Sequence, residues 1–421
     1  MKSLGDALAE ILSHVGELEA EDAPLRGCVG QALATNVYAD HDLPSLDLCG
    51  PDGYAVRSED ISGASPQNPA VLRVLGGNRA GHLPRHQLRQ GMALRVMTGS
   101  PVPLGADCVV PFEQTDEPGD KNGPGPRMVP HVKVFQECRP GANINPAGSN
   151  LRKGMPVAPR GTVIGPAQIS VLASVGAPMV KVIRRARVAI MSTGDELVRL
   201  GRPLRPGTCY DSNSPALAVL VTHCGGIPFF KGISKDNVQS LAAKLRTGLT
   251  ADAIITSGGV SKGDYDLVRL LLERMGRVVF SRLDTGPGAS FAFGTVSREA
   301  GERGAAEVPV FAIAGPPSGC LVNFETLVRP ALLKMMGCAV TAHPTIEATA
   351  VGSVTGRRPM SFVKWTHLEK VDGVHQVVVN LAEERGLTGA MATANSLTII
   401  PRGTEVAAGD RLQVLPLDWA R

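Results

Sequence analysis

The stretch Asp252-Ala-Ile-Ile-Thr-Ser-Gly-Gly-Val-Ser-Lys-Gly-Asp-Tyr-Asp266 carries the strongest structural signal in the chain. Its apolar and β-branched start gives way to two glycines, and helical periodicity follows at 267–275. This order predicts a strand, a tight turn and a helix. Glycines after a strand let the backbone approach a ligand closely, and the N–H groups of the turn and of the helix start suit a phosphate.

The same alternation continues on both sides of this stretch. It predicts a parallel sheet that is covered by helices on both faces, with a ligand crevice at the carboxyl ends of the strands. Apolar runs that read as strands lie at 188–191, 227–232, 253–256, 278–283 and 308–313, and helical segments lie at 216–224, 238–245, 267–275 and 321–336.

Acidic residues are concentrated in the loops that follow these strands. Acids crowded around a phosphate seat would repel it unless a divalent cation lay between them, and Mg²⁺ prefers one or two carboxylates together with phosphate oxygens. The pattern therefore favours a magnesium–phosphate site. The simpler alternative is that these residues only cap helices or form solvated turns, and Asp236 in particular is predicted to cap a helix. The acids are Asp195, Glu196, Asp211, Asp236, Asp264 and Asp266.

Composition excludes several classes of protein. A length of 421 residues suggests about two to four domains. With a net charge of +4 and no basic run, we expect no nucleic-acid partner. No apolar run approaches a membrane span and the N-terminus lacks a signal-peptide core, so we expect a soluble, cytoplasmic protein with no membrane partner.

Histidine and cysteine spacing argues against a zinc site. Eight scattered cysteines form no C-x-x-C and are expected to be buried free thiols. His82 and His86 have helical metal spacing, but Pro84 lies between them and makes a helix there doubtful.

The rest of the chain predicts further domains. An amphipathic helix is expected at 3–15, a β-rich block at 55–139 that interrupts an N-terminal unit, and a small β-barrel or sandwich after Gly337. The segment 116–126 reads as a surface loop. On local grounds Asp52 is a turn residue, and Thr98 is either a turn hydroxyl or a ligand.

Several strings, taken in order, resemble the molybdopterin molybdenumtransferases, the family of MoeA and the gephyrin E domain. The resemblance spans essentially the full length, and it is carried by Pro51-Asp-Gly-Tyr-Ala-Val56, Met97-Thr-Gly-Ser-Pro-Val-Pro-Leu-Gly-Ala-Asp-Cys-Val-Val110, Ser192-Thr-Gly-Asp-Glu-Leu197, Tyr210-Asp-Ser-Asn213 and Ser257-Gly-Gly-Val-Ser261.

This resemblance implies an α/β multidomain fold with four parts. They are an elongated N-terminal domain (1–54 and 140–182), a β-rich inserted domain (55–139), a MogA-like doubly wound α/β domain that binds molybdopterin (183–339) and a C-terminal β-barrel (340–421). It also implies a homodimer whose site lies between domains of opposite subunits.

The implied activity is that of a transferase in molybdenum cofactor biosynthesis. With Mg²⁺, such enzymes cleave adenylylated molybdopterin, insert molybdate and release AMP. By position, Asp236 and Asp266 match the acids that handle the metal and the pyrophosphate, and Asp52, Thr98 and Glu196 match other residues tied to activity. The implied substrate-binding residues are Ser192, Thr193, Gly194, Asp211, Ser212, Asn213, Ser257, Gly258, Gly259 and Ser261.

The chain departs from the family pattern beside the expected site. Where the family has Lys-Pro-Gly-Lys, with lysines thought to hold molybdate, this chain has Gly286-Pro-Gly-Ala289. The family's Gly-Glu-Asp is Gly148-Ser-Asn150, its Asn-Pro is Pro316-Pro317, and its Met before Asp-Gly-Tyr is Pro51. Two alternatives therefore stay open: a divergent molybdopterin-binding paralogue without efficient metal insertion, and an enzyme of the same fold that uses another oxyanion such as tungstate.

Overall fold

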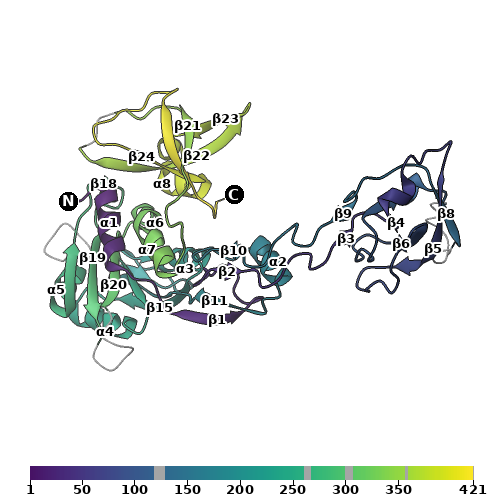
Figure 1. The fold of residues 1–421 in the computed structure, drawn as a ribbon. Coiled ribbons are helices and arrows are strands. Elements are labelled where there is room, and N and C mark those ends of the chain that lie inside the picture. The colour runs from purple at the N-terminus through teal and green to yellow at the C-terminus, as the bar shows by residue number, and fades with distance from the viewer. Residues whose placement is uncertain (118–128, 260–266, 299–306, 356–358, 421) are drawn as a thin grey trace. The chain divides into compact units, whose positions relative to one another are not determined.

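The computed structural model describes residues 1–117, 129–259, 267–298, 307–355 and 359–420 (Figure 1). The chain forms two compact units. Residues 1–35, 160–169 and 178–421 make the first, and residues 36–159 and 170–177 make the second. Among the described residues, every helix is too short or too polar to cross a membrane. The four domain boundaries expected from the sequence remain a prediction.

A six-stranded sheet forms the centre of the first unit. Its four strands β15, β12, β16 and β20 are mutually parallel, as predicted. The expectation of an all-parallel sheet is wrong for β19, which runs antiparallel to both of its neighbours and was missed in the sequence. The link from β19 to β20 is too short for the crossover helix that parallel neighbours need. The spatial order is β15 (Ile227–Ser234), β12 (Arg187–Thr193), β16 (Ala253–Ser257), β20 (Glu307–Ile313), β19 (Ala292–Ser297) and β17 (Gly276–Phe280).

Helices cover both faces of this sheet because its buried strands have apolar side chains on both sides (Figure 1). On β12, Val188 and Ile190 face one core, while Ala189 and Met191 face the other. The first core contains α1 (Leu4–His14), α3 (Asn213–His223), α6 (Pro317–Asn323), the π-helical turn η3 (Phe324–Val328) and α7 (Arg329–Met335); the second contains α4 (Val238–Gly248) and α5 (Leu267–Met275).

Helix starts follow local chemistry, with one correction. The predicted N-terminal helix begins after Ser3, whose hydroxyl accepts the Asp6 N–H at 3.1 Å. Asp236, predicted as a cap, is not one. The cap of α4 is Asn237, whose extended backbone lets its side chain accept the Ser240 N–H at 2.8 Å.

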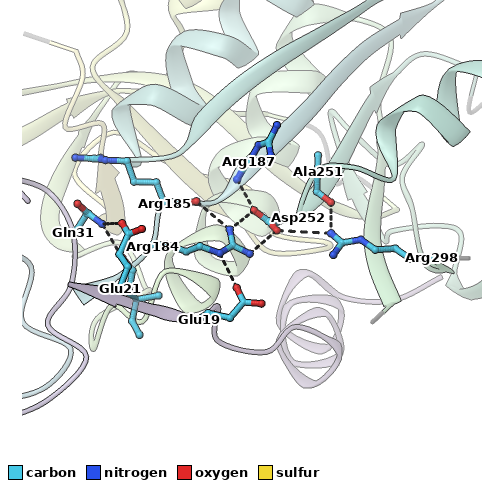
Figure 2. Close-up of polar contacts among 10 residues, drawn as sticks. Glu19, Glu21, Gln31, Arg184, Arg185, Arg187, Ala251, Asp252 and Arg298 are labelled. Atoms are coloured by element: carbon cyan, nitrogen blue, oxygen red, sulfur yellow. Dashed lines mark hydrogen bonds and ion pairs between the residues drawn. The ribbon is translucent and has the colours of Figure 1, made fainter. Parts of the chain in front are cut away.

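The base of the central sheet holds a buried ion-pair network (Figure 2). Asp252, just before β16, accepts two hydrogen bonds from the Arg184 guanidinium at 2.6 and 2.8 Å and one from the Arg187 N–H at 2.8 Å. Arg298 lies 3.8 Å from the same carboxylate, and Glu19 accepts from Arg184 Nε at 2.7 Å. These contacts join the start of β16 to the segment before β12 and to the segment before β1 (Ala20–Pro24), which pairs with β11 (Met179–Ile183).

The C-terminal part of the first unit is a closed barrel, as predicted. Strands β22, β23, β21, β25 and β24 follow one another around it, and β24 pairs back onto β22. Helix α8 (Leu381–Thr393) was not predicted from the sequence. The strand predicted at 376–381 ends earlier, at Val378, before this helix begins. The barrel strands are β21 (Ile346–Val351), β22 (Ser361–Val371), β23 (Val374–Val378), β24 (Ser396–Ile400) and β25 (Arg411–Pro416), and β18 (Thr285–Gly286) adds to β22 in parallel.

A buried carboxylate ties the π-helical turn to the end of the chain. Glu325 is 1% exposed, accepts the Trp419 indole N–H at 2.7 Å and lies 2.8 Å from His343 Nε2. Arg329, one turn further along, pairs with Asp418 at 3.2 Å. The last helical element of the α/β core is therefore completed by residues at the far end of the sequence.

The second unit is built around a five-stranded sheet, in agreement with the predicted β-rich block. Tyr54 is fully buried at its centre and donates a short hydrogen bond to Glu117. Residues 79–90 form no helix, as expected from Pro84, and most of the surface loop predicted at 116–126 lies outside the described residues. The sheet order is β7 (Cys108–Pro111), β4 (Gly53–Val56), β6 (Met92–Val96), β5 (Ala70–Asn78) and β8 (His131–Val134).

Short pairings complete the two units. The eight cysteines are free thiols, as predicted, but the expectation that they are buried is wrong for Cys209, which is exposed. The remaining elements are β2 (Val37–Tyr38), β3 (Leu48–Cys49), β9 (Ile144–Asn145), β10 (Pro156–Ala158), β13 (Leu197–Val198), β14 (Cys209–Tyr210), α2 (Pro166–Ser174) and the short helices η1 (Ser58–Ile61) and η2 (Phe112–Gln114).

Candidate functional site

A crevice of about 990 Å³ opens at the carboxyl ends of β12, β16 and β20 in the first unit. This is the edge where parallel α/β sheets bind ligands. Among the described residues, the wall contains no lysine, arginine or histidine, and its charged members are acids. The residues that line it include Thr193, Glu196, Leu197, Cys209, Tyr210, Asp211, Ser212, Asn213, Asp236, Ser257, Gly258, Gly259, Gly286, Pro287, Gly288, Ala289, Ser290, Pro317 and Gly319.

Asn213 joins three walls of the crevice. Its amide nitrogen donates to Ser257 Oγ at 2.6 Å and to the Gly315 carbonyl at 2.7 Å. Asn213 begins α3, Ser257 ends β16, and Gly315 follows β20. A single buried side chain thus fixes the spacing of three loops. The side chains of Asn213 and Ser257 both form hydrogen bonds within the protein.

Asp211 is likewise engaged with its own loop. Its carboxylate accepts the Ser192 hydroxyl at 2.9 Å, and the Ser214 hydroxyl and N–H at 2.7 and 3.1 Å. Asp211 therefore caps the start of α3, which agrees with the simpler interpretation of this residue. Ser192 and Gly194 are buried and do not line the crevice.

The glycine turn after β16 has the backbone that the sequence predicted. Gly258 and Gly259 have φ of +86° and +72°, and a Cβ on Gly258 would lie 2.5 Å from the Thr193 carbonyl oxygen. Only glycine allows this approach. Beside the turn, the buried Thr193 hydroxyl has no hydrogen-bond partner among the described residues, although it lines the crevice. A buried unpaired hydroxyl is costly, and a ligand oxygen would satisfy it.

Two exposed acids line the crevice on the β15 side. Glu196 and Asp236 come from the loops after β12 and β15, and the Asp236 N–H lies 3.4 Å from Asp195 Oδ1. No three His, Cys, Asp or Glu side chains gather as a metal site in the part of the chain that the structure describes. Two carboxylates nevertheless suffice for Mg²⁺ when a substrate phosphate supplies further oxygens.

The opposite wall is a loop of small residues held by close backbone contacts. Asn323 donates to the Gly288 carbonyl at 3.0 Å, and a Cβ on Gly319 would lie 2.9 Å from Gly288 N. A Cβ on Gly286 would lie 3.2 Å from the Phe362 ring of the barrel. Sequence reasoning missed Asn323 and Gly319. The only signal for them was a helix that starts next to Pro316-Pro317.

Cys320 sits behind this wall and is fully buried. Burial raises the pKa of its thiol to about 12, so the side chain stays protonated near neutral pH. Cys320 therefore packs in the hydrophobic core behind the crevice as a neutral thiol.

Two family models match successive parts of the chain. Residues 2–176 match the MoeA N-terminal region (domain I and II), and residues 189–334 match a probable molybdopterin binding domain. A molybdopterin molybdenumtransferase of a Nostoc species is 32% identical over 99% of this chain and 94% of its own length. The chain belongs to the molybdopterin molybdenumtransferase family.

Other members agree with this assignment. A molybdopterin molybdenumtransferase 2 of Mycobacterium tuberculosis is 35% identical over 94% of both chains. The structure of a molybdopterin biosynthesis MoeA protein from Pyrococcus horikosii covers 99% of both chains with a TM-score of 0.81 and 29% identity. The resemblance and the multidomain α/β fold expected from the sequence are thus confirmed.

The site residues implied by the molybdenumtransferase family fall into three groups. Glu196 and Asp236 lie together at the crevice with most of the expected substrate-binding residues. Asp266 and Ser261 lie outside the described residues, as does Asp264. Asp52 and Thr98 lie in the second unit and contact each other, because Asp52 Oδ1 accepts both the N–H and the hydroxyl of Thr98, at 2.7 and 2.8 Å. All their roles remain predictions.

Proposed function

We propose that this member of the molybdopterin molybdenumtransferase family inserts molybdate into adenylylated molybdopterin and releases AMP in molybdenum cofactor biosynthesis. Its relatedness to such transferases over nearly its full length, together with a crevice whose acids face a phosphate-suited glycine turn, supports this function. A pyrophosphate and a metal oxyanion are the ligands that such a crevice must accommodate.

The residues present fit a magnesium ion by their donor chemistry. Glu196 and Asp236 are exposed carboxylates on the crevice wall, and Mg²⁺ combines such groups with phosphate oxygens and water. Asp266 is the further acid that we propose as a ligand. When bound, the ion would neutralise charge that develops on the leaving phosphate.

The remaining residues have positioning roles. We assign the turn at Gly258 and Gly259 to phosphate binding through backbone N–H groups, and the unpaired Thr193 hydroxyl to a second polar contact. Asn213 keeps the three loops at a fixed spacing, so the substrate meets a pre-formed site.

Removing Asp236 tests the acid pair. Asp236→Ala should abolish Mg²⁺-dependent AMP release while the circular dichroism spectrum and the melting temperature stay as in the wild type. Glu273→Ala, an exposed acid on α5 outside the crevice, is the matched control and should keep its activity. Unchanged turnover of the Asp236 variant would exclude this residue from the mechanism.

We further propose that the cytoplasmic enzyme acts as a homodimer, in which Asp52 and Thr98 of one subunit serve the crevice of the other. Mixing inactive Asp52→Ala and Asp236→Ala variants tests this arrangement. Hybrid dimers would carry one intact set of residues and regain part of the wild-type activity. If the mixture stays inactive although pull-down of one affinity-tagged variant recovers the untagged other, each subunit uses its own residues.

The way the crevice would hold molybdate leaves alternative functions to be tested. Because no cation lines the crevice among the described residues, tungstate use or molybdopterin binding without efficient insertion are the alternatives. The deciding assay measures AMP release and active cofactor with Mg²⁺, alone and with molybdate or tungstate. Molybdate-dependent cofactor formation supports the transferase, a preference for tungstate supports the altered oxyanion, and binding without turnover supports the divergent paralogue.

A further inference from the structure

Two cations converge on a glycine beside the crevice. Gly232 lies in β15 with φ of +76°, next to a bulge that breaks the pairing with β12. Arg199 Nη2 and Lys244 Nζ lie 3.3 and 3.7 Å from the point where a Cβ on Gly232 would sit. Because the residue is glycine, the space between the two cations stays open.

Neither cation is neutralised by the protein. Lys244, on α4, donates one hydrogen bond to the Lys231 carbonyl at 2.5 Å and has two further N–H groups. Within the described ranges, no carboxylate lies within 4.0 Å of Arg199 or Lys244. Two positive charges aimed at the same point repel each other, and an anion between them would reverse the sign of that interaction.

The cation pair borders the acid side of the crevice. Arg199 follows Leu197, which lines the crevice, by two residues, and Gly232 precedes Asp236 by four. The Gly194 N–H also donates to the Ser234 carbonyl at 3.2 Å, so the end of β15 is held against the loop that leads to Arg199. These short chain separations and this hydrogen bond place the cation pair near the acid side of the crevice.

We propose that Arg199 and Lys244 form a phosphate subsite that takes the adenylate phosphate of the nucleotide-linked substrate. The assignment to adenylate rests on the proposed function, while the anion site stands on its own geometry. A planar guanidinium and an ammonium can each donate charge-assisted hydrogen bonds to different oxygens of one phosphate. The competing explanation is that Lys244 only caps the bulge carbonyl and that Arg199 is a solvated surface residue.

Binding of AMP, inorganic phosphate and adenosine, measured by calorimetry without turnover, tests the subsite. Arg199→Gln and Lys244→Gln should each weaken AMP binding roughly 10-fold or more, and adenosine binding should not change. Arg246→Gln, an exposed arginine two residues further along α4, is the matched control and should bind AMP normally. Lys244→Arg should restore most of the affinity.

The variants and ligands together distinguish the possible explanations. The Arg199 side chain has no hydrogen bond or ion pair to other described residues, so Arg199→Gln is not expected to disturb folding even if Lys244→Gln does. Unchanged affinity for both AMP and inorganic phosphate in Arg199→Gln overturns the subsite. If Arg199→Gln weakens phosphate binding but leaves AMP binding intact, the adenylate assignment is overturned. The binding measurements require no molybdate insertion, so they can be interpreted even if the proposed function is wrong.

Discussion

Replacing Asp252 with asparagine should destabilise the first unit, because the change removes the negative charge at the base of the central sheet (Figure 2). The Asp252 side chain is 2% exposed, and those of Arg184 and Arg298 are 18% and 9% exposed. Asparagine keeps the size but, among the described residues, leaves Arg298 without a counter-charge and Arg184 with only the exposed Glu19. Breaking one partner out of a buried ion pair typically costs about 3–5 kcal/mol, and we expect a loss in that range.

The effect should depend on pH with a definite sign. Burial by itself raises the pKa of Asp252, but hydrogen bonds from Arg184 and the Arg187 N–H and the charges of Arg184 and Arg298 lower it below its usual value. A carboxyl whose pKa is lowered by folding stabilises the protein above its unfolded pKa of about 3.9, and this contribution is lost as the pH falls through the folded value. The difference between wild type and variant should be complete at neutral pH and shrink below roughly pH 4.

Urea unfolding followed by circular dichroism, from pH 7 down to pH 3, provides the measurement. Glu19→Gln is the matched control, since Glu19 bonds the same Arg184 but is 74% exposed, and exposed pairs contribute about 1 kcal/mol or less. If Asp252→Asn changes the unfolding free energy no more than Glu19→Gln does, the buried network does not hold the sheet base and the reasoning is refuted.

Three further changes probe the crevice. Asn213→Ala removes two buried hydrogen bonds, including that to Ser257, and should cost about 1–3 kcal/mol in urea unfolding and raise KM; an unchanged KM would show that loop spacing does not matter. Gly258→Ala places a Cβ 2.5 Å from a backbone oxygen at positive φ, so activity should fall roughly 100-fold with the overall fold retained, and wild-type activity would mean that the turn tolerates the shift. Ala289→Lys should tighten molybdate binding in equilibrium dialysis more than Gly286→Lys, whose Cβ would press on a barrel ring; equal affinities would contradict this difference.

Much of the fold could be predicted because periodicity and turn residues in the sequence agree with the packing in the structure. Helix α5 has the bounds predicted from its periodicity, and the glycine turn before it was expected from Gly258 and Gly259. Strand β19 was missed because it is placed by antiparallel pairing with β17 and β20, and which strands become neighbours is a tertiary property. Helix α8 was missed because Gly386, at φ of +69°, kinks it and weakens the pattern.

The sequence predicted where the site residues lie, but it did not predict which contacts each side chain makes. Asp236 and Asn237 are both good caps, and only the extended backbone of Asn237 decides that it caps α4 while Asp236 lines the crevice. Asp211 also lies where expected, yet its carboxylate serves its own loop. Side-chain partners such as these come from contacts between segments far apart in the sequence, which periodicity and composition do not encode.

The contact between Glu325 and Trp419 sets an order of events during synthesis. The ribosome makes Glu325 first and Trp419, which donates a hydrogen bond to this buried carboxylate, 94 residues later. Until Trp419 has left the exit tunnel, Glu325 lacks one of its hydrogen-bond donors, and an unsatisfied buried acceptor is costly. The helical layer around Glu325 is therefore complete only after the whole barrel that follows it in the sequence has been synthesised.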